Sequence, residues 1–225
     1  QGRLNEAEPL FLEALKISRQ TLPAGHPDIA NSLGNLAQFY QVQGRLNDAE
    51  PLFLEDLKIN RQALPAGHPD IATSLNNLAL LYIDQGRPND AEPLFLEALK
   101  IGSQTLPAGH PDIATSLNNL ALLYQAQGRL NDAEPLYLEA LKIYRQALPA
   151  GHPDIAISLS HLAGLYTDQG RLNDAEPPSL DALQIRPPAL PAGPPNIHMS
   201  LNPLPSLFHA QRPPPHSQPH HTAAP

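Results

Sequence analysis

The apolar residues of the chain recur at spacings that predict pairs of amphipathic helices. The first helix of one such pair spans residues 69–84, and its apolar face is Ile71, Leu75, Leu78, Ala79 and Tyr82. Pro69 suits the first turn, because its missing N–H would have no partner there, and Asp70 suits the positive end of the helix dipole. Gly86 follows as a residue that ends the helix in a left-handed cap.

A second amphipathic helix is predicted after this glycine. Its apolar face consists of Ala91, Leu94, Phe95, Ala98, Leu99 and Ile101. Asn89 stands three residues before Glu92, a spacing that resembles a capping box, so the helix is expected to begin near Asn89. Pro93 is expected in the first turn or just after it, where a proline costs little. Leu106-Pro107-Ala108-Gly109 then ends the helix.

The same unit recurs every 42 residues without insertion or deletion. His-Pro-Asp-Ile begins at His26, His68, His110 and His152, and each occurrence starts a first helix. Second helices are expected near Asn5, Asn47, Asn89 and Asn131, with a weaker fifth near Asn173. One helix pair exposes too much apolar surface to be stable alone, so neighbouring pairs must stack. The pattern therefore predicts an all-α solenoid of antiparallel helix pairs.

The residues of this unit resemble the tetratricopeptide repeat. The segments Leu75-x2-Leu78-Ala79-x2-Tyr82 and Ala91-x3-Phe95-x2-Ala98 match the pattern W-x2-L-G-x2-Y…A-x3-F, with leucine for tryptophan and alanine for glycine. Armadillo and HEAT repeats also use helix pairs of similar length. Small residues at Ala79 and Ala91, beside the large Tyr82 and Phe95, favour the tetratricopeptide repeat.

The unit is longer than the usual tetratricopeptide repeat of about 34 residues. Its length of 42, with His110-Pro111-Asp112 and Leu117-Asn118-Asn119-Leu120-Ala121, resembles the kinesin light chain type. The resemblance covers Gly2 to about Glu176 and implies a right-handed superhelical solenoid. It also implies a protein–protein interaction scaffold with a concave groove lined by the first helices.

The composition changes after residue 176. Of the 27 prolines, 14 lie in residues 177–225, although the 42-residue register continues through Leu190-Pro191-Ala192-Gly193. Pro178, Pro187 and Pro188 are expected to damage the preceding second helix. Two regions are therefore predicted: a solenoid at 1–176, starting mid-repeat, and a degenerate, Pro-rich segment at 177–225. The latter is a degenerate capping unit, a disordered tail with a ligand role at Pro213-Pro214-Pro215, or a repeat decayed by mutation.

Composition narrows the class of partner. The net charge of −8 argues against nucleic acid and anionic membranes, which require basic clusters. No cysteine is present, and no apolar run approaches the roughly 18 residues of a membrane span. With no signal peptide at its start, the chain is expected to be cytoplasmic, and its opening in mid-repeat suggests a fragment of a longer array.

The groove implied by the resemblance would be lined by the first-helix residues that the core does not use. These are Asn31, Gly34, Asn35 and Gln38, then Thr73, Asn76, Asn77 and Leu80, then Thr115, Asn118, Asn119 and Leu122. An asparagine amide donates and accepts, as an extended peptide backbone requires. The alternative is that these asparagines are solvated or bond to a neighbouring helix and fix the packing of repeats.

The absence of basic residues from this stripe affects the expected ligand. Chaperone-binding members of the family hold a terminal carboxylate with lysine and arginine. Here every lysine (Lys16, Lys58, Lys100 and Lys142) lies on a second helix, and the stripe holds no arginine. A carboxylate clamp is therefore not expected. The groove is expected to prefer ligands of neutral or mixed charge.

No catalytic, metal or cofactor site is predicted. The four repeated histidines lie in equivalent places at least about 8–10 Å apart, whereas zinc needs nitrogens within about 2.1 Å. They are expected to act in the linkers and at helix starts. Ser160 and His161 are adjacent on a helix, so they point in different directions and form no nucleophile–base pair.

Three functions are consistent with these observations. The first is a scaffold that binds a peptide or partner protein in the groove. The second is a regulatory arm of a larger signalling NTPase or protease whose catalytic domain lies outside the chain. The third is self-association through the exposed ends of the array.

Overall fold

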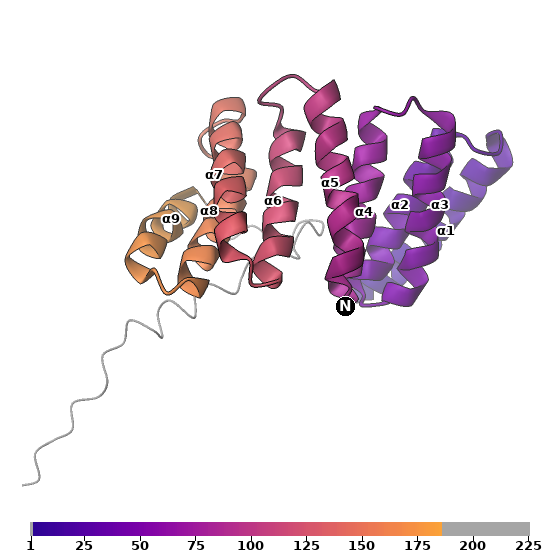
Figure 1. Ribbon diagram of the computed structural model, residues 1–225. Coiled ribbons are helices and arrows are strands. Elements are labelled where there is room, and N and C mark those ends of the chain that lie inside the picture. The colour runs from indigo at the N-terminus through magenta and orange to yellow at the C-terminus, as the bar shows by residue number, and fades with distance from the viewer. Residues whose placement is uncertain (1, 186–225) are drawn as a thin grey trace, which may run out of the picture.

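The computed structural model describes residues 2–185, and within them every regular element is a helix. The helices are α1 (Gly2–Thr21), α2 (Pro27–Val42), α3 (Leu46–Ala63), α4 (Pro69–Asp84), α5 (Pro88–Thr105), α6 (Pro111–Ala126), α7 (Leu130–Ala147), α8 (Pro153–Asp168) and α9 (Leu172–Ile185). They follow one another as stacked antiparallel pairs (Figure 1). The all-α solenoid is therefore confirmed, and residues 186–225 of the predicted degenerate segment lie outside the described residues.

Each complete first helix begins with the same local structure. A histidine is the N-cap, and its Nδ1 accepts the backbone N–H two residues later; for His68 and Asp70 the distance is 3.2 Å. Proline takes the first helical position, as predicted for Pro69. The same arrangement recurs at His26, His110 and His152. The histidines therefore act at helix starts, as expected, by accepting a hydrogen bond that the helix itself cannot satisfy.

Each first helix ends in a Schellman motif around a glycine. Gly86 has φ of +71°, its N–H donates to the carbonyl of Ile83 at 2.9 Å, and the Arg87 N–H donates to the carbonyl of Tyr82 at 2.7 Å. Only glycine adopts this left-handed conformation without strain. The predicted left-handed cap is therefore present, and it reverses the chain into the second helix.

The predicted capping box at the start of the second helices is wrong. The N-cap is Arg87 rather than Asn89, and its side chain makes no capping hydrogen bond. The glycine turn already brings Pro88 into helical conformation, so Asn89 is inside the helix and exposed. Arg87 instead donates from Nε to Asp90 at 2.8 Å. Pro93 is also farther in than expected, at the sixth helical position.

Arginine at this N-cap joins adjacent repeats. The Arg87 guanidinium lies 4.1 Å from the ring centroid of Tyr82 and donates from Nη1 to Glu50 of the preceding repeat at 2.9 Å. Equivalent contacts join Arg45 to Tyr40 and Glu8, Arg129 to Tyr124 and Glu92, and Arg171 to Tyr166 and Glu134. The conserved spacing of the repeat thus produces a ladder of stacked, ion-paired arginines.

The core lies between the two helices of each pair and between successive pairs. Leu75, Leu78 and Ala79 of the predicted first-helix face are buried, as is Phe95 of the second, whereas Tyr82 is half-buried under Arg87. Successive first helices also contact one another, α2 with α4, α4 with α6 and α6 with α8, while the second helices show no comparable packing in the described chain. The first helices therefore lie on the inner side of the curved stack.

Helix α9 continues beyond the predicted boundary at residue 176. It passes through Pro177 and Pro178 and ends at Ile185. Ala175, Ser179 and Ala182 are buried, and α9 packs along α8 as the other second helices pack along their partners. Pro178 therefore does not break the helix as expected: it lies within its first half, and packing against α8 offsets the lost hydrogen bond.

Candidate peptide-binding groove

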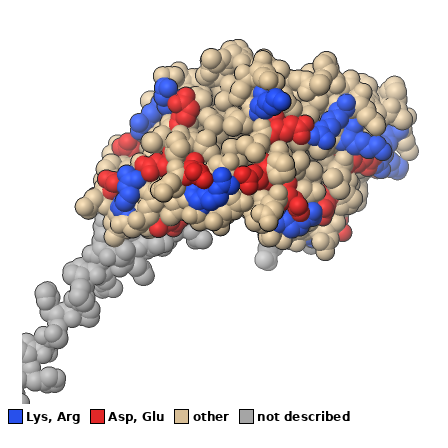
Figure 2. All heavy atoms as spheres, viewed as in Figure 1, with Lys and Arg blue, Asp and Glu red and all other residues tan. Residues whose placement is uncertain are grey.

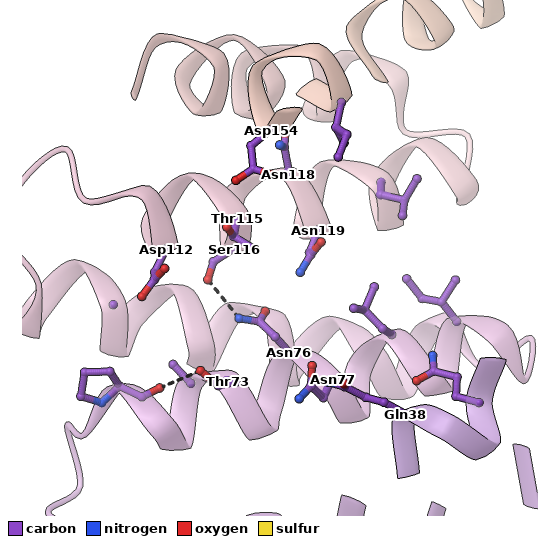
Figure 3. Close-up of a pocket in the computed structure, with 18 of the residues that line it drawn as sticks. Gln38, Thr73, Asn76, Asn77, Asp112, Thr115, Ser116, Asn118, Asn119 and Asp154 are labelled. Atoms are coloured by element: carbon purple, nitrogen blue, oxygen red, sulfur yellow. Dashed lines mark hydrogen bonds between the residues drawn. The ribbon is translucent and has the colours of Figure 1, made fainter. Parts of the chain in front are cut away.

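A cavity of about 570 Å³ lies along the inner side of the solenoid. Its walls come mainly from α4 and α6, with contributions from α2 and α8 (Figure 3). The predicted stripe residues that line it are Gln38, Thr73, Asn76, Asn77, Leu80, Thr115, Asn118, Asn119 and Leu122. Asn31 and Asn35 are exposed on α2 but are not part of the lining. The fold thus brings most of the predicted stripe into one groove.

The paired asparagines of each first helix have different surroundings. Asn76 donates from Nδ2 to Ser116 on α6 at 3.1 Å (Figure 3), and Asn118 accepts from Ser158 on α8 at 3.4 Å. These two asparagines therefore join successive first helices, which is the role in repeat packing that was the alternative to ligand binding. Asn77 is half-buried in the lining, whereas Asn119 is 5% exposed. Asn77 is the better-placed amide for a ligand.

One buried acceptor of a lining residue has no donor. Asn76 Oδ1 is inaccessible to water and has no hydrogen-bond partner among the described residues. Leaving a buried polar atom unpaired costs about 1–3 kcal/mol. The Asn76 nitrogen is already used by Ser116. Because this oxygen is inaccessible, the unpaired acceptor belongs to the packed contact between α4 and α6 and not to the open surface of the groove.

Sequence reasoning missed several lining residues, because it considered only the stripe on the first helices. Asp112 and Asp154 come from first turns, and Tyr144 comes from the second helix α7. The Tyr144 hydroxyl lies 2.8 Å from Thr115 Oγ1, and burial raises the pKa of this tyrosine to about 12. The His-Pro-Asp motif marked both aspartates, but only as residues suited to a helix dipole.

Gly102 on α5 leaves room beneath the groove. It is buried and lines the cavity, whereas Asn60 and Tyr144 stand at the same position in the neighbouring second helices. Asn60 fills its place and bonds to Ser74 of the next first helix at 2.9 Å. At Gly102 no side chain reaches Ser116, so the cavity extends between α4, α5 and α6.

His161 ends the row of amides. It takes the place of Asn119 one repeat later, is 9% exposed, and neither ring nitrogen has a partner among the described residues. Its ring lies 5.6 Å from that of Tyr137, and burial lowers the pKa of this histidine to about 4. Ser160 donates instead to the carbonyl of Ala156 at 2.9 Å. This serine and histidine are therefore packed independently.

No group of three or more histidine, cysteine, aspartate or glutamate side chains between residues 2 and 185 is arranged to hold a metal ion. Over the same range, no helix has the length and apolar character to cross a membrane.

The stacked pairs and the inner groove define a helical-repeat solenoid. A tetratricopeptide repeat family model matches residues 1–55, 28–104 and 112–187, and a second matches residues 76–147. The chain therefore belongs to the tetratricopeptide repeat family. No curated protein matches its sequence at a significant level.

Similar solved structures carry repeats of the predicted type. BtubC (BKLC) from P. vanneervenii has a TM-score of 0.69 and 27% identity, over 85% of this chain and 79% of its own. The nearly identical TPR-like repeats of a candidate kinesin light chain from Podosopora anserina have a TM-score of 0.65 and 29% identity, over 82% and 87%. The expected likeness to kinesin light chain repeats is thus confirmed.

Proposed function

We propose that this chain is an interaction module that holds an extended peptide segment of a partner protein in the groove of α4 and α6. Tetratricopeptide repeats generally mediate protein–protein interactions, and the fold is typically a non-catalytic scaffold. The proposal rests on the composition of the cavity lining, which combines amides with leucines: Asn77, Leu80 and Leu122 all line the same cavity. Such a wall suits a peptide, because amides pair with its backbone and leucines cover its side chains.

An accessible amide and the size of the cavity support the same function. Asn77 lines the cavity and is half-buried, and an extended peptide presents an N–H at every residue except proline. The size of the cavity, about 570 Å³, is also within the range of about 300–1,000 Å³ that ligand pockets occupy. The groove therefore fits a short segment rather than a folded domain.

The test is selection of binders from a phage-displayed library of random dodecapeptides on the full chain, followed by fluorescence anisotropy with the selected peptides. The groove variant is Asn77→Ala with Leu80→Ala. The control is Asn47→Ala with Leu54→Ala, which removes an exposed asparagine and an exposed leucine from the second helix α3. We expect binding at least about tenfold weaker in the groove variant, since truncating central contacts commonly costs more than about 1 kcal/mol each.

Circular dichroism should be the same for all three proteins, which would separate lost binding from lost folding. Failure to select any peptide, or equal weakening in the groove and control variants, would contradict the proposal and direct attention to the outer face or the array ends.

A further inference from the structure

We propose that the groove selects a partner segment that carries lysine or arginine, with the first-turn carboxylates of α6 and α8 as its charged contacts. This inference rests on the proposed function and adds the chemistry of the ligand. It also departs from the expectation of neutral or mixed ligands, which did not include these carboxylates in the groove.

The charge of the lining has one sign. Asp84, Asp112 and Asp154 line the cavity, and within residues 2–185 no lysine, arginine or histidine does. The Asp112 and Asp154 side chains are 69% and 46% exposed, so both are accessible (Figure 3). A cationic segment would therefore meet attraction along the whole groove, and an acidic segment repulsion.

The basic residues of the repeats lie outside this lining, and the arginines from Arg19 to Arg171 are ion-paired. Arg61 on α3 bonds to Glu97 on α5 at 2.6 Å, and Arg87 at the start of α5 bonds to Glu50. Figure 2 shows basic and acidic side chains side by side over the face that it presents. Residues 1–185 contain all 22 acidic residues but only 12 basic ones, so the excess negative charge belongs to the solenoid.

The neighbouring histidines use Nδ1 to cap their helices. His110 Nδ1 lies 3.6 Å from Asp112 and accepts the backbone N–H of Asp112. His152 and Asp154 repeat this arrangement. The helix N-termini contribute only about half a positive charge each, so a full carboxylate charge outweighs them.

Spacing and hydrogen bonding favour an extended segment with repeated donors. Asp112 and Asp154 occupy equivalent positions on adjacent first helices, and packed helices lie about 8–10 Å apart. An extended chain covers that distance in about two or three residues. Guanidinium and ammonium groups are donors only, so they match the carboxylates of Asp112 and Asp154.

The test uses three labelled dodecapeptides of identical length, four copies each of Ala-Arg-Ser, Ala-Gln-Ser or Ala-Glu-Ser, titrated with the full chain by fluorescence anisotropy. The groove variant is Asp112→Asn with Asp154→Asn. The matched control is Glu13→Gln with Glu139→Gln, which removes the same charge from exposed positions on second helices. Titrations run at about 50 and about 300 mM NaCl, because screening weakens exposed charge contacts.

We expect the arginine peptide to bind wild type and control alike, to bind the groove variant at least about fivefold more weakly, and to lose affinity in high salt. Equal weakening in the groove and control variants would overturn the inference, because only net charge would then matter. Tighter binding of the glutamate peptide would also overturn it.

Two further outcomes separate this inference from the proposed function. In the first outcome, the glutamine peptide binds as tightly as the arginine peptide, and Asn77→Ala weakens the binding of both. The groove would then still bind peptides, but the proposed charge preference would be rejected. The arginine peptide could instead bind only the variant Arg186→Gln with Arg212→Gln. That result would assign the groove to the chain's own residues 186–225 and overturn the assignment to a partner.

Discussion

Ser74 Oγ donates to Asp56 Oδ1 at 3.1 Å, across the contact between α4 and α3. Asp56 is 4% exposed and stands where the other second helices have alanine. Gly34 accommodates it, since a Cβ there would lie 3.3 Å from Asp56 Oδ2. Burial raises the pKa of this aspartate to about 6. A carboxylate has thus been placed in the core of one repeat, with Asn60 and Ser74 as its hydrogen-bond partners.

We expect Asp56→Asn to stabilise the protein at pH 7. The pKa of Asp56 in the folded state is about 6, above its ordinary value of 3.8, so the fold favours the protonated carboxyl. The contribution of this group to stability is therefore lowest above pH 6 and rises as the pH falls from 6 toward 3.8. The difference is roughly 1–3 kcal/mol. An asparagine keeps the bond from Ser74 and can donate to Asn60 Oδ1, which is buried without a partner in the described chain.

Urea denaturation between pH 4.5 and 8 measures this effect, in wild type and in Asp56→Asn. The control is Glu13→Gln, an exposed charge removal on α1. A variant less stable than wild type at pH 7 would show that the hydrogen bonds outweigh the cost of burying the charge.

His161 is expected to give the opposite pH dependence. Burial lowers its pKa to about 4 from 6.5, so the fold favours the neutral ring. Its contribution is complete above pH 6.5 and is lost progressively as the pH falls from 6.5 to 4, by up to roughly 3 kcal/mol. His161→Asn, which restores the residue of the equivalent position 119, should remove this loss. The same urea titrations test it: wild type should change little between pH 6.5 and 4.5, and Asp56→Asn and His161→Asn should slope in opposite directions. Parallel slopes in the two variants would refute the assignment.

Gly102→Ala should stabilise the solenoid by about 0.5–1 kcal/mol, because glycine inside a helix is less favourable than alanine. A Cβ at this position would make ordinary contacts, 3.8 Å from Ile113 Cγ1 and 3.9 Å from Leu106 Cδ1. Thermal denaturation of the variant measures the gain. Gly86→Ala is the comparison: its φ of +71° strains any side chain, so that variant should melt below wild type. A fall in melting temperature for Gly102→Ala would mean that the groove contracts around the missing side chain.

The two ends of the array are expected to associate at high concentration. Ile17 on α1 is 50% exposed, although its equivalent Ile59 is 8% exposed, and Leu183 on α9 is 45% exposed, although its equivalent Leu141 is 6% exposed. The equivalent residues Ile59 and Leu141 are covered because another repeat packs against them, whereas Ile17 and Leu183 lie at the two ends of the described array. Sedimentation velocity over a range of concentrations should show reversible association that Ile17→Lys with Leu183→Glu abolishes. Leu96→Glu, an equally exposed leucine on the outer face of α5, should leave it unchanged; loss of association in that variant would instead locate the contact on the outer face.

The sequence by itself determined the element order, because each signal acts within a few residues. The 42-residue period, Pro69 at a first turn and Gly86 at a left-handed cap need no distant partner, and all agree with the structure. The start of the second helices was misplaced for a local reason as well: the turn after Gly86 makes Arg87 the N-cap and leaves Asn89 inside the helix.

Tertiary structure alone decided how the stripe residues are used. Asn76 and Asn77 are neighbours on one helix, yet only the position of α6 determines that Asn76 bonds to Ser116 while Asn77 faces the cavity. The entry of Asp112 and Asp154 into the lining, and the burial of His161, depend in the same way on packing between repeats. Periodicity specifies the face of a helix on which a side chain lies, whereas its burial, pKa and partners depend on residues about 40 positions away that stacking brings into contact.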